Sequence, residues 1–199
     1  MSKYYFDKKA SDKAIGFIET FITHTKGEKA GESLILEDWQ KKIISNLFGM
    51  KIKENGLRKY RTCYIQVPRK NGKTTLCAAI GLYMLFADRE RGGEIYASAG
   101  DRNQANIIFD IAKQMILNNP ELSKRGKVFR NSIINESKGN FFKAISSDSS
   151  TKHGFNASCI LMDEMHVQKN RDLWDTLLTS TGARREPLCI AITTAGYDK

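Results

Sequence analysis

The chain has 199 residues, and its 32 Lys and Arg residues against 22 Asp and Glu residues leave a formal net charge of +10. Hydrophobic residues make up 41% of the sequence, which suits a folded domain with a sizeable core and excludes a disordered tail. No apolar run approaches the roughly 20 residues of a membrane-spanning helix, and the first residues lack the apolar segment of a signal peptide. We therefore expect a single domain over residues 1–199, soluble and intracellular, with no membrane partner. The charge favours a polyanion such as nucleic acid as partner, although a protein that is merely basic is the alternative.

Two amphipathic helices are expected near the start of the chain. Apolar side chains recur at helical spacing in residues 11–25 and again from Asp38 to Phe48. Residues 51–59 then form a charged connector, which overlaps one of two groups of positive charge. Neither group is interleaved with aromatic residues as in sites that stack single-stranded bases. The first group is Lys51, Lys53, Arg58, Lys59 and Arg61, and the second is Lys124, Arg125, Lys127 and Arg130.

The central motif is residues 67–75, Val-Pro-Arg-Lys-Asn-Gly-Lys-Thr-Thr, which follow an expected strand (61–67) and precede an expected helix ending near Ala87. A strand, a tight loop ending in Gly-Lys-Thr and a helix are the parts of a phosphate-binding loop. The match is incomplete, because Val67 stands where the usual pattern has its first glycine. Pro68 also removes one backbone N–H from the loop. The loop alone therefore does not establish the function.

The residue types of the loop suit nucleotide chemistry. Gly72 lets the backbone approach the phosphates, Lys73 can reach the β- and γ-phosphates, and Thr74 can place its hydroxyl on Mg²⁺. Upstream, Gln40 lies at the start of the second helix, where many nucleotide-binding proteins with such a loop use a glutamine amide to read adenine. A solvated side chain is the other interpretation of Gln40. The loop residues expected to contact ATP are Arg69, Lys70, Asn71, Gly72, Lys73, Thr74 and Thr75.

The middle of the chain continues the alternation of strand and helix. Residues 94–99 predict a second strand, and residues 101–118 predict a helix that begins with a capping box. Two further strands, 127–135 and 140–145, are expected to pair antiparallel as an addition at the sheet edge. A polar segment ending in glycine, 146–154, follows them.

Two later apolar runs end in polar groups. Residues 159–164, Cys-Ile-Leu-Met-Asp-Glu, are typical of a buried parallel strand, whose carboxyl end is where open α/β sheets bind ligands. Asp163 would hold Mg²⁺, and Glu164 would be the general base that activates the attacking water. A strand that runs into a solvated acidic turn is the alternative. Residues 188–196 predict another strand, whose terminal hydroxyls could sense the γ-phosphate or form an ordinary turn.

These motifs together resemble the large terminase subunit of tailed bacteriophages, from about residue 12 to the end of the chain. The resemblance rests on residues 67–74, 160–164 and 192–196, with Trp39 and Gln40 upstream. A loop without the first glycine and with arginine at position 69 is normal in that family. The resemblance implies an ATPase motor that packages double-stranded DNA into a procapsid. It further implies that Arg69 contacts the γ-phosphate, that Thr193 and Thr194 belong to a coupling motif, and that Gln40 belongs to the adenine motif.

The same resemblance implies partners and a further domain. Such motors work as rings, commonly of five subunits on the portal, in the host cytoplasm and together with a small terminase subunit. A neighbour's basic residue completes each site, and Lys152 and His153 are the candidates for a trans-acting finger in this sequence. Family members also carry a C-terminal endonuclease domain. Because the chain stops at Lys199, soon after an expected strand, we expect an ATPase domain without nuclease activity.

The expected fold is a three-layer α/β P-loop NTPase with a mostly parallel central sheet, helices on both faces and a small antiparallel edge addition. If the strand 159–163 lies between the loop strand and the second strand, the fold is of the additional-strand, catalytic-glutamate type. Three alternatives remain for the function: a helicase-like nucleic-acid translocase, a small-molecule kinase, and a non-catalytic DNA-binding assembly module with a relic nucleotide pocket.

Overall fold

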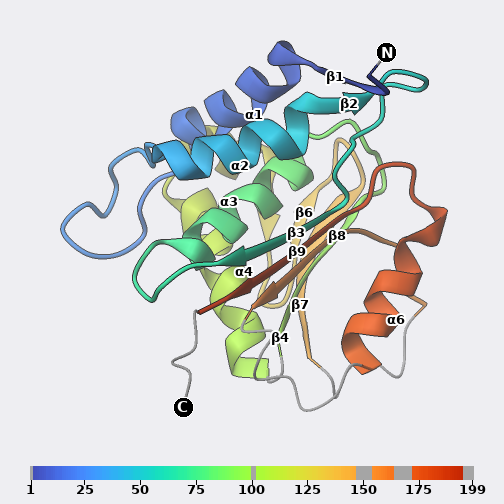
Figure 1. Ribbon diagram of the computed structural model, residues 1–199. Helices are drawn as coiled ribbons and strands as arrows, with labels where there is room; N and C mark the ends of the chain where they lie inside the picture. Colours follow the sequence, from blue (N-terminus) through green and yellow to red (C-terminus); the bar gives the residue numbers. More distant parts are fainter. Residues whose placement is uncertain (1, 100–101, 147–153, 164–171, 195–199) are drawn as a thin grey trace, which may run out of the picture.

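A seven-stranded sheet forms the centre of the computed structural model, which describes residues 2–99, 102–146, 154–163 and 172–194 (Figure 1). The strand order is β3-β9-β8-β4-β7-β6-β5. Neighbours from β3 to β7 are parallel, whereas β6 and β5 are antiparallel to their neighbours. The fold is therefore α/β with a mixed, mostly parallel sheet. The strands are β3 (Thr62–Gln66), β4 (Glu94–Ala99), β5 (Lys127–Val128), β6 (Ile133–Asn135), β7 (Asn140–Ser146), β8 (Ala157–Asp163) and β9 (Leu188–Thr193).

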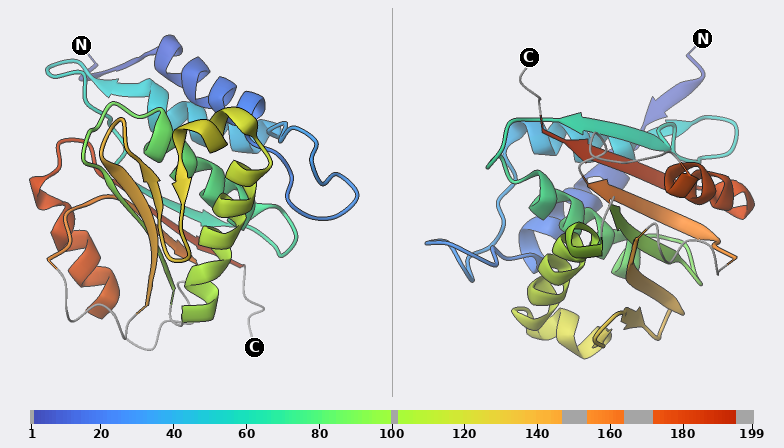
Figure 2. Two further views of the ribbon diagram at one scale, coloured as in Figure 1. Left: turned by 180° about the vertical axis from the view of Figure 1, so that it is seen from behind. Right: turned by 90° about the horizontal axis from the view of Figure 1, so that it is seen from below.

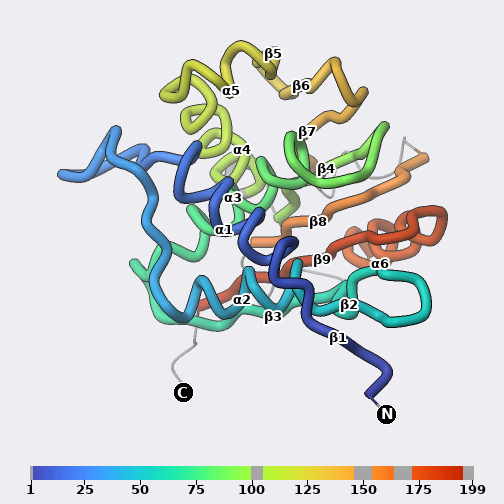
Figure 3. The backbone as a smooth tube through the Cα atoms, turned by 90° about the horizontal axis from the view of Figure 1, so that it is seen from above, coloured from blue at the N-terminus to red at the C-terminus, as the bar shows by residue number. Residues whose placement is uncertain are grey.

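The helices lie on both faces of this sheet. Figure 3 shows α1–α4 on one side of the sheet and α6 on the other. In Figure 2, α5 lies beside the edge formed by β5 and β6. Over the described part of the chain, none of the helices has both the length and the apolar character needed to cross a bilayer. Their bounds are α1 (Lys8–Phe21), α2 (Asp38–Gly49), α3 (Lys73–Phe86), α4 (Arg102–Leu117), α5 (Pro120–Arg125) and α6 (Asp172–Ser180), the last followed by the 3-10 turn η3 (Thr181–Ala183).

The two neighbouring interior strands β8 and β9 are buried along their whole length. Their side chains alternate between two apolar clusters, as the pleat of a strand requires. On β8, Leu161 packs in the cluster beneath α1–α4, and Ile160 packs in the cluster with α6. On β9, Ile190 and Cys189 divide in the same way. This double burial explains why both strands have continuous apolar sequences.

The structure differs from the sequence prediction at several boundaries. Helix α1 begins at Lys8, before the predicted start, because the Asp7 carboxylate caps it by accepting a hydrogen bond from the Ala10 N–H. The predicted connector contains a strand, β2 (Met50–Ile52), which pairs antiparallel with β1 (Tyr4–Phe6). The predicted strand 127–135 is two short strands. Its partner β7 is antiparallel to β6 but parallel to β4, so β7 lies inside the sheet rather than at its edge.

Part of the first basic group is internal. Arg58 and Lys51 are only 1% and 5% exposed. The Arg58 guanidinium pairs with the Asp88 carboxylate at 2.7 Å and donates to the Glu186 carbonyl. The Glu186 carboxylate accepts from the Arg58 N–H at 2.6 Å and lies 3.5 Å from the Lys51 ammonium. The sequence alone placed Arg58 and Lys51 in a basic group that could bind a polyanion. In the fold they are internal instead, and their contacts join β2, the end of α3 and the segment before β9.

Electrostatics within this buried network favour the charged guanidinium. Burial by itself lowers the pKa of Arg58, but the Asp88 and Glu186 carboxylates outweigh burial, and the net direction is upward. For Lys51, burial is the largest influence and the pKa is lowered, although Glu186 opposes the change. The network therefore depends on its two carboxylates to keep a buried positive charge in place.

Candidate nucleotide-binding site

Three strands end side by side at one edge of the sheet, and the candidate site lies there. The order β3-β9-β8 pairs Gln66 with Thr193 and Asp163 with Ile192. The N–H of Val67 donates to the Thr193 carbonyl at 3.3 Å, which ties the start of the loop to the end of β9. Because carboxyl ends of parallel strands meet at the same edge, the loop after β3 lies near the polar ends of β8 and β9.

The loop has a backbone that only certain residues adopt easily. Gly72 is the N-cap of α3 and has φ 70°, in the left-handed region that favours glycine. Lys70 has φ 68° and is the one non-glycine residue with positive φ in the described ranges. The Asn71 side-chain amide donates to the carbonyls of Pro68 and Arg69 at 3.2 and 3.3 Å. The loop is thus braced internally directly before α3, whose first N–H groups favour an anion.

The predicted site residues fall into a buried and an exposed set. Lys73, Asp163, Thr193 and Thr194 are each at most 9% exposed, and each interacts with other groups of the protein. Thr74 and Thr75 are half-buried in the first turn of α3. Arg69, Lys70 and Asn71 are exposed on the loop. Lys73, Asp163 and Thr193 lie on regular elements and Thr194 directly follows β9, which places their polar atoms firmly, and the exposed residues are accessible to a ligand.

Cys77 shows that Lys73 and Asp163 act on the same small region. Cys77 lies one turn after Lys73 on α3 and is fully buried. Burial is the main cause that raises the pKa of its thiol well above the usual value; the Asp163 carboxylate adds to the rise and the Lys73 ammonium opposes it. The two charged groups predicted to flank a metal–nucleotide complex therefore both influence this one buried thiol, although they are far apart in the sequence.

Gln40 packs against the loop. Its side chain is 7% exposed, so the interpretation of a solvated glutamine is wrong. Its amide oxygen accepts from the Glu37 N–H at 2.9 Å in a capping box at the start of α2. Its amide nitrogen lies 3.6 Å from where a Cβ on Gly72 would stand. Sequence reasoning missed this support of the loop, although the Glu-x-x-Gln spacing before a helix is a recognisable signal of the capping box.

The donor set at this edge fits Mg²⁺. Thr74 supplies a hydroxyl and Asp163 a carboxylate, and Mg²⁺ is usually held by one or two carboxylates together with substrate phosphates and waters. Three predicted residues, the base Glu164 and the candidate fingers Lys152 and His153, lie outside the described residues.

The geometry and motifs match one known family. The family described as "Terminase large subunit, ATPase domain" matches residues 38–199. The chain belongs to this family. The terminase ATPase domain is thus the fold that positions the loop, Asp163 and Thr193 at one sheet edge.

Solved and curated terminases are similar to the chain over most of its length. The large terminase subunit of Enterobacteria phage HK97 is 28% identical over 192 residues, which are 92% of this chain and 36% of that subunit. The crystal structure of the HK97 large terminase superposes with a TM-score of 0.78, covering 92% of this chain and 37% of that one. The ATPase domain of the Thermus phage P74-26 large terminase is 17% identical to this chain, and the superposition covers 71% of this chain and 64% of the P74-26 domain. Its TM-score of 0.55 shows the same fold. The chain spans little more than a third of the HK97 subunit.

Proposed function

We propose that this domain hydrolyses ATP in the motor that drives double-stranded DNA into a phage procapsid. The observation that carries the proposal is a buried lysine, Lys73, directly after the phosphate-binding loop and a buried aspartate, Asp163, at the end of β8, in a chain of the terminase ATPase family. A relic pocket would have no need to keep a buried lysine and a buried aspartate together, because buried charges are costly unless they are used or paired.

Each part of the site has a role in this proposal. The loop N–H groups and Lys73 bind the β- and γ-phosphates, and Thr74 and Asp163 hold Mg²⁺, which offsets the phosphate charge when bound. Glu164 directly follows Asp163 and would align and deprotonate the attacking water. Arg69, exposed on the loop, would contact the γ-phosphate and offset the charge that develops there. Because β8 lies between β3 and β4, together with β9, and with Glu164 as base, the domain would be of the additional-strand, catalytic-glutamate type.

The remaining nucleotide contacts lie on either side of the loop. Lys70, Asn71, Gly72 and Thr75 would surround the phosphates. Gln40, which lies against Gly72, would read adenine through its amide. Thr193 and Thr194 at the end of β9 would sense the γ-phosphate, and the bond from Val67 to Thr193 offers a direct connection between that strand and the loop.

The partners follow from the packaging role. We propose that residues 1–199 form a single ATPase domain and that it acts in a ring, of five subunits, on the portal in the host cytoplasm. Double-stranded DNA is the substrate that moves, and the small terminase subunit is a further partner. The endonuclease activity would belong to residues of the full-length protein outside 1–199.

One measurement separates this function from its rivals. We expect Mg²⁺-dependent ATP hydrolysis that rises when double-stranded DNA is added, and we expect Lys73→Ala to abolish it. A helicase would instead separate the strands of a partial duplex. A kinase would transfer phosphate to a small acceptor in place of water, and an assembly module would bind DNA without hydrolysis. Absence of hydrolysis with the duplex, in a chain that binds ATP, would overturn the proposal.

The trans-acting finger has its own test. Lys152→Ala is expected to lower DNA-stimulated hydrolysis at least about tenfold, because a finger offsets charge in the transition state. Lys127→Ala, an exposed lysine paired with Glu136, is the matched control and should have no effect. An equal mixture of Lys152→Ala with Glu164→Gln subunits should recover activity, since each supplies what the other lacks. Hydrolysis near the wild-type rate in Lys152→Ala would exclude Lys152 as the finger.

A further inference from the structure

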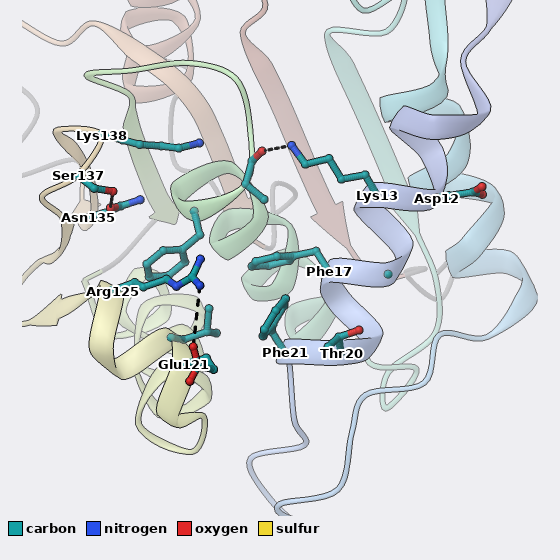
Figure 4. Close-up of a pocket in the computed structure, with 14 residues that line it drawn as sticks. Asp12, Lys13, Phe17, Thr20, Phe21, Glu121, Arg125, Asn135, Ser137 and Lys138 are labelled. Carbon is teal, nitrogen blue, oxygen red and sulfur yellow. Dashed lines mark hydrogen bonds and ion pairs between the residues drawn. The ribbon is translucent and has the colours of Figure 1, made fainter.

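A cavity of about 610 Å³ lies at the far end of α3 from the phosphate-binding loop (Figure 4). Its walls are α1, the end of α3, α5 and the turn after β6. Because α3 has 14 residues and a helix rises about 1.5 Å per residue, the cavity is roughly 20 Å from the loop. Nothing in the nucleotide chemistry proposed above uses it.

The floor of the cavity is aromatic. Phe17, Phe21 and Phe86 line it and are each half-buried. The Phe17 ring centroid lies 5.4 Å from that of Phe21 and 5.6 Å from that of Tyr83, so the floor is held by ring contacts. Phe86 packs closely on Gly126, where a Cβ would come within 2.7 Å of the ring. These contacts hold the floor in place as a surface for another ring or apolar group.

Two ammonium groups stand over this floor. Lys13 donates to the carbonyl of Ala87, and Lys138 donates to the carbonyl of Asp88, both at the end of α3. In Figure 4 the side chains of Lys13 and Lys138 extend toward each other across the cavity. Burial lowers the pKa of Lys138, and the nearby Lys13 lowers it further, although Asp88 opposes them. Each ammonium has three N–H donors and uses one for the helix end, so donors remain for an anion.

The carboxylates of the cavity are directed elsewhere. Asp12 pairs with Lys8 and points away from the cavity in Figure 4. Glu121 pairs with Lys124 at 3.0 Å and lies 3.9 Å from Arg125, at the outer rim. In the described part of the chain, neither Lys13 nor Lys138 forms an ion pair with a carboxylate. The cavity thus combines an apolar floor with two cations that form no ion pair among the described residues.

We propose that this cavity binds an acidic, aromatic segment of a partner protein, with a ring against Phe17 and Phe86 and a carboxylate between Lys13 and Lys138. Charge complementarity identifies the carboxylate, and the ring-lined floor identifies the apolar neighbour. Duplex DNA fits less well, because it offers phosphates on a broad convex surface and no apolar group that reaches a recessed floor.

The test uses a defined probe, the peptide acetyl-Phe-Asp-Phe-Glu-amide, titrated to millimolar concentration into the ¹⁵N-labelled chain. We expect saturable shifts of the amides around Gly16 and Lys138. The neutral analogue with Asn and Gln should bind about tenfold more weakly, the value of a charge-assisted hydrogen bond. Lys138→Gln should weaken binding of the acidic peptide by a similar factor. Lys8→Gln makes an equal charge change on an exposed lysine and should leave peptide binding unchanged.

A second variant pair tests the cavity without changing charge. Gly16 lines the cavity, and a Cβ there would meet nothing within 4 Å. Gly16→Leu therefore places a bulky side chain at the wall of the cavity and should weaken peptide binding at least tenfold. Gly16→Ala adds only the Cβ and should bind the peptide normally. Any one of three results would overturn the proposal. They are the absence of saturable amide shifts, a Gly16→Leu variant that binds the peptide as tightly as the wild type, and displacement of the peptide by a short DNA duplex.

Discussion

Replacing Glu164 with glutamine is expected to lower the turnover of ATP by about 100- to 10,000-fold and to leave ATP binding unchanged. The range is that of a general base, which contributes to the transition state and not to the ground state. Glutamine keeps the size of the side chain and removes its basicity. Turnover should be measured by phosphate release at saturating ATP, Mg²⁺ and double-stranded DNA, and binding by titration with a non-hydrolysable ATP analogue.

Two controls make this result specific. Glu136→Gln changes an exposed glutamate far along the chain, paired only with Lys127 in the described structure, and should leave turnover intact. Asp163→Asn should instead weaken the binding of the Mg²⁺–nucleotide complex, because it removes a metal ligand and not the base. Undiminished turnover in Glu164→Gln would remove Glu164 from its role, and equal losses of binding and turnover would assign it to the metal.

Asp88→Ala is expected to reduce the free energy of unfolding by about 3–5 kcal/mol, because it leaves the Arg58 charge buried without its partner. The two side chains are 2% and 7% exposed and lie 2.7 Å apart. The Arg58 Nε already has no hydrogen-bond partner in the described structure, and without Asp88 the guanidinium keeps its bond to the Glu186 carbonyl and the weaker influence of the Glu186 carboxylate. Equilibrium unfolding in urea measures the change, with the slope checked for two-state behaviour.

The matched control is Asp12→Ala. Asp12 pairs with Lys8, but these side chains are 57% and 80% exposed, and such surface pairs contribute less than about 1 kcal/mol. The same chemical change should therefore have a much smaller effect at this position. A double variant, Asp88→Leu with Arg58→Met, removes both charges of the buried pair and should cost less than Asp88→Ala if the uncompensated charge is the cause. A loss below about 1 kcal/mol in Asp88→Ala would show that the network does not hold these elements together.

Much of the fold could be predicted because its signals are local. The strands β8 and β9 have continuous apolar sequences, and α3 follows the glycine that ends the loop after β3, so periodicity and loop chemistry locate them. The boundaries were less predictable. Asp7 starts α1 early through a capping bond from the Ala10 N–H, and β2 pairs with β1, which lies far along the chain. Short strands that depend on a distant partner have no strong local signal.

For the candidate site, the sequence by itself was enough to propose the chemistry: Gly72, Lys73 and Thr74 are adjacent, and Asp163 ends an apolar run, so neighbours along the chain predict phosphate and metal binding. Only the tertiary structure decided that β9 lies between β3 and β8, that Gln40 packs on Gly72, and that Cys77 lies within reach of both Lys73 and Asp163. The tertiary structure also shows that Arg58 is a buried partner of Asp88 and not an exposed member of a basic group, and that a cavity lies over Phe17. The physical reason is the same in each case: strand order, burial and cavities arise from pairing between segments far apart in sequence, and local periodicity carries no information about which segments meet.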